Sequence, residues 1–154
     1  MVDLTKIRTP EHIFVYGTLR RCCSMHYRMG LDQATKYVGP GFLRGEMYDC
    51  GEYPGIRVRY GSDPDGPWIR GDLLRITDED VIPALDCYEG YSKEDPAGSL
   101  YKRTWCFVAG RQGGSVRIRS WVYEYNKQFS DKPIVKSGDW ITYETDRKLA
   151  NCSD

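Results

Sequence analysis

The most constraining feature of the sequence is a pair of strand-like segments separated by a four-residue turn. Residues 102–110 and 115–125 are rich in aromatic and β-branched side chains, and the turn between them reads Arg111-Gln112-Gly113-Gly114. Within the second segment the residues alternate in character, Val116, Ile118 and Val122 with Arg117, Arg119 and Trp121. A period of two predicts a strand with one packed face and one polar or ligand-facing side. We therefore expect a β-hairpin here.

Four further segments have strand character. Residues 12–16 form a short aromatic and β-branched run that stops at Gly17, which predicts a buried strand. The others are residues 42–49, 55–60 and 68–76, and the turn-rich residues 61–67 precede the last of these. Aromatic residues make up 13% of the chain, which also holds sixteen glycines. This composition favours a sheet or barrel with turns between its strands.

Helical signals are few. Residues 22–30 predict a short helix, and the best candidate follows Thr77, which with Asp80 resembles a capping box. Pro83 resists a helix interior, so the helix is expected to start only there, with a looser turn before it. It must end near Glu89, because Gly90 is a natural residue to follow a helix end.

The chain end carries weaker signals. Gly138-Asp139-Trp140 predicts a closing turn, and residues 147–154 are expected to form a frayed tail. A length of 154 residues matches one domain spanning residues 1–154. Together these patterns predict an α+β fold, a small mixed, mostly antiparallel β-barrel with few short helices.

The charge balance excludes some classes of partner. The 22 Lys and Arg residues equal the 22 Asp and Glu residues, so the chain lacks the basic excess that nucleic-acid binding and polybasic membrane anchoring require. No apolar run approaches the roughly 18–20 residues of a transmembrane helix. The first residues carry charges and no apolar core of a signal peptide. We therefore expect a soluble, cytoplasmic protein without nucleic-acid or membrane partners.

The six cysteines are expected to be reduced thiols, because the chain is long enough to fold without disulfides and shows no secretion signal. Cys22, Cys23 and His26 have a spacing compatible with metal ligands, but no second ligand pair follows, so no metal site is predicted. Gly39-Pro40-Gly41 begins a dinucleotide-loop pattern, which fails because Arg44 replaces the third glycine and a strand follows. No cofactor is predicted.

Two features remain as candidate chemistry. A strand that runs into a glycine turn at Tyr16-Gly17-Thr18-Leu19 leaves backbone N–H groups that can bind a carboxylate or phosphate, although an ordinary strand end has the same pattern. Glu89 lies at a predicted helix C-terminus between Tyr88 and Tyr91. The helix dipole and shielding from water would both raise its pKa, which suits proton transfer near neutral pH. A solvated glutamate that closes a helix is the alternative.

These two motifs occur in the same order in a known family. The chain resembles the gamma-glutamyl cyclotransferase-like family through Tyr16-Gly17-Thr18-Leu19 and Glu89-Gly90. The form of the loop, Thr18-Leu19, resembles the branch that acts on gamma-glutamylamines. The supporting segments are Gly45-Glu46-Met47-Tyr48, Gly71-Asp72-Leu73, Tyr101-Lys102-Arg103, Trp121-Val122-Tyr123 and Ser137-Gly138-Asp139-Trp140. The resemblance covers a core of about residues 12–143.

The resemblance implies a small barrel with one cavity and an enzyme that releases 5-oxoproline and a free amine from a gamma-glutamyl amide. The substrate's own α-amine would attack its γ-carbonyl. By position, the backbone of Tyr16, Gly17, Thr18 and Leu19 would hold the glutamyl α-carboxylate, and Glu89 would be the general acid and base. Tyr101 and Tyr123 are expected to line the cavity. Backbone N–H groups or a tyrosine hydroxyl would stabilise the oxyanion.

The substrate of such an enzyme is a small molecule, and neither a metal nor a cofactor is needed. Two other readings stay open. One is a non-catalytic cavity protein that binds a glutamyl or other small amino-acid metabolite. The other is an enzyme that uses the same cavity for a different acyl transfer. Segments that match no family pattern, Arg20-Arg21-Cys22-Cys23 and Asp95-Pro96-Ala97-Gly98, would shape the cavity mouth and leave the identity of the amine open.

Overall fold

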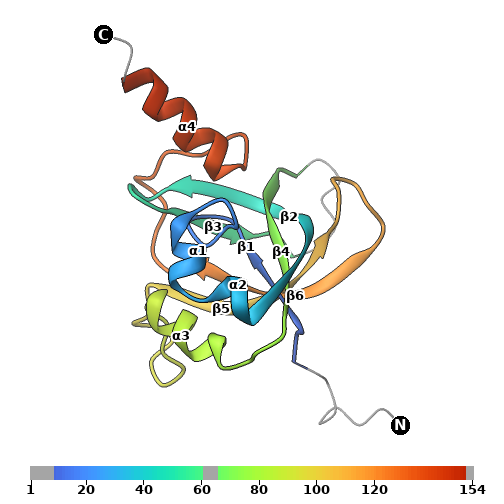
Figure 1. Ribbon diagram of the computed structural model, residues 1–154. Helices are drawn as coiled ribbons and strands as arrows, with labels where there is room; N and C mark the ends of the chain where they lie inside the picture. Colours follow the sequence, from blue (N-terminus) through green and yellow to red (C-terminus); the bar gives the residue numbers. More distant parts are fainter. Residues whose placement is uncertain (1–8, 61–65, 152–154) are drawn as a thin grey trace.

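The computed structural model describes residues 9–60 and 66–151, and in them the chain forms six strands and four short helices. Figure 1 shows these elements coloured along the sequence. In chain order they are β1 (His12–Val15), α1 (Ser24–Arg28), α2 (Leu31–Ala34), β2 (Thr35–Asp49), β3 (Pro54–Val58), β4 (Trp68–Ile76), α3 (Val81–Tyr88), β5 (Tyr101–Ala109), β6 (Arg117–Tyr125) and α4 (Trp140–Asn151).

Five of the strands close into a barrel. The sheet order is β3-β2-β4-β1-β6-β5, and a further pairing of β2 with β5, at Phe42 and Ala109, joins the ends of the five-strand part. Strand β3 pairs with β2 alone and lies outside the closed ring. All pairings are antiparallel except that of β1 with β6, which is parallel. The predicted mixed, mostly antiparallel barrel with few short helices is therefore confirmed.

Strand β2 is longer than the sequence indicated. The prediction began the strand at Phe42, whereas β2 starts at Thr35 and runs for 15 residues. The glycines and proline at positions 39–41 suggested a break, but the pairing with β4 shifts register between Tyr37 and Gly39 and then continues. Such an irregularity bends a strand without ending it, so β2 can curve around the barrel and pair with β3, β4 and β5.

Two apolar clusters explain why β1 is apolar on both faces. Phe14 points into the barrel, where it packs with side chains from the other strands, among them Leu43, Met47, Ile69 and Val108. Ile13 and Val15 point outward into a second cluster with Leu31 of α2 and Leu85 of α3. A strand buried on both faces shows a continuous apolar run rather than alternation. This arrangement confirms the predicted buried strand.

The prediction for α3 was correct in position and wrong in its start. The helix begins at Val81 and ends at Tyr88, and Asp80 at its N-cap makes no side-chain capping hydrogen bond. The Thr77 capping box does not form, because Asp78 accepts the backbone N–H of Asp80 instead (3.0 Å). Pro83 is the third helical residue, where the first turn needs no backbone N–H donor, so the proline does not delay the helix.

The expected frayed tail is wrong for residues 147–151, which form the second half of α4. The predicted turn at Gly138 leads into this helix, and Asp139 caps it by accepting the backbone N–H groups of Ile141 (3.1 Å) and Thr142 (3.4 Å). Trp140 is buried in the barrel cluster, which fixes the start of the helix. In Figure 1, α4 projects away from the barrel, on the side opposite α3.

The remaining elements agree with the prediction with small differences. Strand β4 has the predicted bounds, the hairpin strands β5 and β6 are present, and α1 occupies the middle of predicted residues 22–30. Val116, predicted to pack, is 73% exposed just before β6. The predicted turn at 61–67 lies mostly outside the described residues. None of the helices in the described ranges is long and apolar enough to cross a membrane.

Candidate active site

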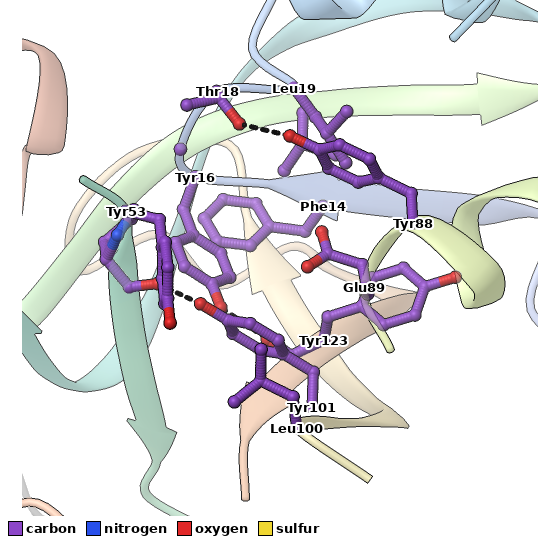
Figure 2. A pocket seen from close by; sticks show the side chains of 13 residues that line it. Phe14, Tyr16, Thr18, Leu19, Tyr53, Tyr88, Glu89, Leu100, Tyr101 and Tyr123 are labelled. Carbon is purple, nitrogen blue, oxygen red and sulfur yellow. Dashed lines mark hydrogen bonds between the residues drawn. The ribbon is translucent and has the colours of Figure 1, made fainter. Parts of the chain in front are cut away.

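The end of α3 places Glu89 at the wall of the barrel. Glu89 is the C-cap, and Gly90 follows with φ +68°, a left-handed conformation that glycine adopts without steric cost. The N–H of Gly90 donates to the carbonyl of Cys87 (3.2 Å), and the N–H of Tyr91 donates to that of Asp86 (2.8 Å). This pair of bonds is the Schellman motif, which ends the helix sharply. Figure 2 shows the Glu89 carboxylate directed into a cavity.

The cavity has a volume of about 220 Å³ and opens between α3, the loop after β1 and the turn before β3. Every residue that the sequence singled out for the site lines it, namely Glu89, Tyr16, Gly17, Thr18, Leu19, Tyr101 and Tyr123. These residues come from β5, β6, the end of α3 and the segment after β1. The structure therefore brings together positions that are up to 107 residues apart in the chain.

The Glu89 carboxylate is buried, and the residues around it in the described part of the chain offer it no hydrogen bond or ion pair. Burial raises its pKa from 4.5 to about 7. Desolvation penalises the charged form of a carboxyl group, which explains the direction. We expected Tyr88 and Tyr91 to provide the shielding. Tyr88 lines the cavity and Tyr91 does not, and Tyr16, Tyr101 and Tyr123 complete the enclosure.

The hydroxyl groups of three buried tyrosines, Tyr16, Tyr101 and Tyr123, donate hydrogen bonds to acceptors within the protein. Tyr16 donates to the carbonyl of Tyr123 (2.5 Å), Tyr101 donates to the carbonyl of Pro54 (2.7 Å), and Tyr123 donates to Asp86 (2.7 Å). Burial raises the pKa of all three, so they are neutral at physiological pH. A hydroxyl that donates elsewhere offers a ligand only its lone pairs. These hydroxyls can therefore accept from a ligand, and backbone N–H groups remain as donors.

Such donors lie in the loop after β1. The backbone N–H groups of Gly17, Thr18 and Leu19 donate to no acceptor among the described residues. The loop is a tight turn, because the N–H of Arg20 donates to the carbonyl of Gly17 (3.1 Å). Unpaired N–H groups on successive residues of a turn form an anion-binding site. The N–H groups of this loop are therefore available as hydrogen-bond donors, and anion binding by the loop stays a prediction.

Three contacts fix the loop. Gly17 lies so close to Pro54 that an added Cβ would stand 2.9 Å from the proline Cγ. The Nδ1 atom of His26, a buried residue of α1, is 2.8 Å from the carbonyl oxygen of Leu19. Arg20 forms ion pairs with Asp72 (3.4 Å) and Asp139 (3.1 Å). Arg20, which matched no pattern in the sequence, therefore anchors the loop to β4 and to the start of α4.

Several lining residues were not predicted. They are Phe14, Val15, Tyr53, Pro54 and Leu100. Phe14, Val15 and Leu100 adjoin predicted site residues, so their proximity in the chain was a usable signal. Tyr53 lies in the turn between β2 and β3, Pro54 is the first residue of β3, and no local pattern connects this segment with the loop after β1. The pairing of β3 with β2 and the packing of Pro54 against Gly17 bring the two segments together.

No metal-binding cluster of three or more His, Cys, Asp or Glu residues occurs within residues 9–60 and 66–151. His26 makes its contact with the loop instead. Cys22 and Cys23 form no disulfide, and neither do the other described cysteines; Cys152 lies outside the described residues. Among the described residues that line the cavity there is no Lys, Arg, His or Asp, and Glu89 is the one acidic side chain.

Solved structures share the fold. YkqA from Bacillus subtilis is 21% identical with a TM-score of 0.63, and the match covers 92% of this chain but 43% of YkqA, so this chain spans less than half of that protein. An AIG2-like protein from Mus musculus is 22% identical with a TM-score of 0.61, covering 86% of this chain and 90% of the mouse protein. The ytfP protein from Escherichia coli is 21% identical with a TM-score of 0.58, covering 86% and 98%.

These identities are low enough to show the fold alone. No curated protein matches the chain significantly. The model of one protein family, described as "Gamma-glutamyl cyclotransferase, AIG2-like", matches residues 13–142, which include all the site residues discussed above. The chain therefore belongs to the gamma-glutamyl cyclotransferase, AIG2-like family.

Proposed function

We propose that the protein converts a gamma-glutamyl amide into 5-oxoproline and a free amine. One observation carries the proposal: the Glu89 carboxylate, with a pKa of about 7, shares a cavity of about 220 Å³ with backbone N–H groups after β1, and neither has a hydrogen-bond partner in the described part of the chain. A proton-transfer group and an anion site in one small cavity match the two ends of a glutamyl group. Membership of the cyclotransferase family supports the same reading.

The distribution of donors and acceptors orients the substrate. The α-carboxylate accepts hydrogen bonds from the backbone N–H groups of Gly17, Thr18 and Leu19. The α-ammonium group lies toward Glu89 and the oxygens of Tyr16 and Tyr101, which can only accept. This placement pairs each charged group of the substrate with its complement.

The reaction then needs one proton shuttle. The α-ammonium group of the substrate has an unperturbed pKa of roughly 8, close enough to that of Glu89 for proton transfer. The freed amine nitrogen attacks the γ-carbonyl carbon, and a five-membered ring forms. Glu89, now protonated, gives its proton to the departing nitrogen as the C–N bond breaks. The carboxylate regenerated in this way then takes the second proton from the ring nitrogen, which becomes the lactam N–H, and passes that proton to the released amine, which leaves as an ammonium ion. Because nucleophile and electrophile belong to one molecule, correct positioning supplies much of the acceleration.

The cavity also indicates the kind of leaving amine. A gamma-glutamyl amino acid or glutathione carries a further carboxylate on the leaving group, and such a carboxylate would require a cationic partner. The described lining contains none, and the mouth is formed by Tyr53, Tyr88 and Leu100. We infer that the preferred leaving group is an amine without a carboxylate.

The test is detection of 5-oxoproline by mass spectrometry after incubation with gamma-glutamylamines, gamma-glutamyl amino acids and glutathione. We expect product from the gamma-glutamylamines with wild type and with Glu94→Gln, a control on an exposed loop, and at least a thousandfold less with Glu89→Gln. Full activity of Glu89→Gln would refute the assigned base. Thermal stabilisation of wild type by these compounds without any product would instead support a binding protein.

A further inference from the structure

A single carboxylate, that of Asp86, joins the last turn of α3 to two strands of the barrel. Its Oδ1 atom accepts a hydrogen bond from the Tyr123 hydroxyl on β6 (2.7 Å) and another from Nε of Arg103 on β5 (2.8 Å). Its Oδ2 atom accepts from Nη2 of Arg103 (3.2 Å). Asp86 precedes Glu89 by three residues, so the two lie on neighbouring positions of the same helical turn.

The Arg103 side chain is buried and packs against an aromatic ring. Its side chain is 8% exposed, and its guanidinium carbon lies 4.3 Å from the centre of the Trp121 ring. Two parallel N–H···O contacts between a guanidinium and a carboxylate define both distance and orientation. Asp86 accepts all three of these hydrogen bonds, and the Tyr123 hydroxyl is the donor of one of them.

Helix α3 needs such a tether. It has eight residues, fewer than a helix needs for stability by itself, so its position depends on tertiary contacts. Its buried apolar residues, Val81 and Leu85, are the first and the fifth of these eight residues, and none of the last three is buried. At the end that carries Glu89, the contacts with the barrel include the side chain of Asp86, and the backbone carbonyl of Asp86 closes the turn to Tyr91.

We propose that Asp86 is a positioning residue for Glu89, and that Arg103 both holds Asp86 in place and cancels the negative charge that it would otherwise bring to the cavity. This inference rests on the proposed function for its kinetic consequences. The contacts between Asp86, Arg103 and Tyr123 do not depend on the proposed function, and they predict how the titration midpoint of Glu89 changes when either charge is removed.

The titratable and charged groups around Glu89 can be listed by element. They are Tyr16 after β1, Tyr53 before β3, Asp86 and Tyr88 on α3, Tyr101 and Arg103 on β5, and Tyr123 on β6. Burial keeps Tyr16, Tyr101 and Tyr123 neutral at physiological pH. Burial is the one cause of the raised pKa of Glu89, which agrees with charges on Asp86 and Arg103 that cancel.

The test measures the titration midpoint of the Glu89 carboxyl carbon by NMR in protein labelled with [¹³C]glutamate, with the signal assigned by its loss in Glu89→Gln. Arg103→Met leaves Asp86 uncompensated and should raise the midpoint by about one pH unit. Asp86→Asn leaves Arg103 uncompensated and should lower it. The double variant should return the midpoint to the wild-type value, and Lys102→Met, a neighbouring charge loss on β5, should not move it.

Kinetics separate positioning from charge. In the double variant the acid limb of the kcat/KM profile should match that of wild type, while kcat stays about tenfold lower because the bidentate tether is lost. A midpoint that moves in neither single variant, or a double variant with wild-type kcat, would overturn the inference. Should wild type form no 5-oxoproline, the proposed function fails, and the NMR midpoints still decide whether Asp86 and Arg103 control Glu89. Circular dichroism checks that each variant is folded. If Arg103→Met does not fold, the downward shift of the Glu89 midpoint in Asp86→Asn decides the test.

Discussion

The side-chain oxygens of Thr18 and Tyr88 lie 3.2 Å apart and form a hydrogen bond across the mouth of the cavity. Thr18 belongs to the loop that presents free backbone N–H groups, and Tyr88 is the last residue of α3, directly before Glu89. The bond therefore links the proposed anion site to the proposed base, across 70 residues of sequence. Figure 2 shows it at the rim of the cavity, above the Glu89 carboxylate.

This link should be measurable as a coupling between the two residues. We expect Thr18→Val and Tyr88→Phe each to raise KM two- to fivefold, because each removes the same exposed hydrogen bond, which contributes about 0.5–1 kcal/mol. The double variant should be no worse than either single variant. Tyr27→Phe, an exposed tyrosine of α1, serves as the control. Strictly additive effects in this double-mutant cycle would show that the bond does not contribute to binding.

Glu89 should make the protein less stable at alkaline pH than at acid pH. Its pKa is raised from 4.5 to about 7 on folding, so between these values the folded state binds more protons than the unfolded state. The free energy of unfolding must then fall as pH rises through this range. The shift corresponds to up to about 3 kcal/mol, less where water reaches the cavity.

Glu89→Gln removes this titration and should be more stable than wild type at pH 8, by about 2 kcal/mol. At pH 4, where the glutamate is protonated, the two proteins should have similar stability. Urea denaturation at both pH values measures the difference. Equal stability of variant and wild type at pH 8 would mean that the carboxylate is well hydrated, contrary to its enclosed position.

Replacement of Gly17 by alanine should distort the cavity. The new Cβ would approach Cγ and Cδ of Pro54 to 2.9 Å and 3.0 Å, so either the loop or the start of β3 must move. Overpacking of this kind costs about 1–3 kcal/mol. We expect a lower melting temperature and a KM raised at least tenfold. Gly110→Ala, where an added Cβ meets nothing within 4 Å, should change neither quantity.

Loss of Arg20 should destabilise both the loop and α4. Its side chain is 11% exposed and forms ion pairs with Asp72 and Asp139. Arg20→Met therefore leaves two poorly exposed carboxylates without this cationic partner. Removal of one member of a buried ion pair costs about 3–5 kcal/mol, and we expect the lower end of that range because the site is partly open to water. Arg28→Met, an exposed charge at the end of α1, should cost little. A melting temperature shared by both variants would contradict the anchoring role.

Much of the secondary structure was predictable because it depends on local patterns. The hairpin of β5 and β6, the bounds of β4 and the end of α3 at Gly90 follow from alternation, turn residues and a helix-ending glycine. The prediction failed where tertiary contacts outweigh local preference. Strand β2 continues through positions 39–41 because pairing with β4 resumes after an irregularity, and α4 forms because Trp140 is buried and Asp139 binds both the helix start and Arg20.

What the sequence determined by itself was the local character of two candidate segments, the glycine turn after the first strand and the glutamate before Gly90. Their residue types and local turns decide which backbone and side-chain groups are available. What only the tertiary structure decided was their meeting in one cavity and the environment of Glu89. Tertiary packing of β3 and β5 brings Tyr53, Pro54 and Tyr101 to the cavity that holds the carboxylate, and the raised pKa results from burial. Desolvation depends on every atom packed around a group, and no local pattern specifies that packing.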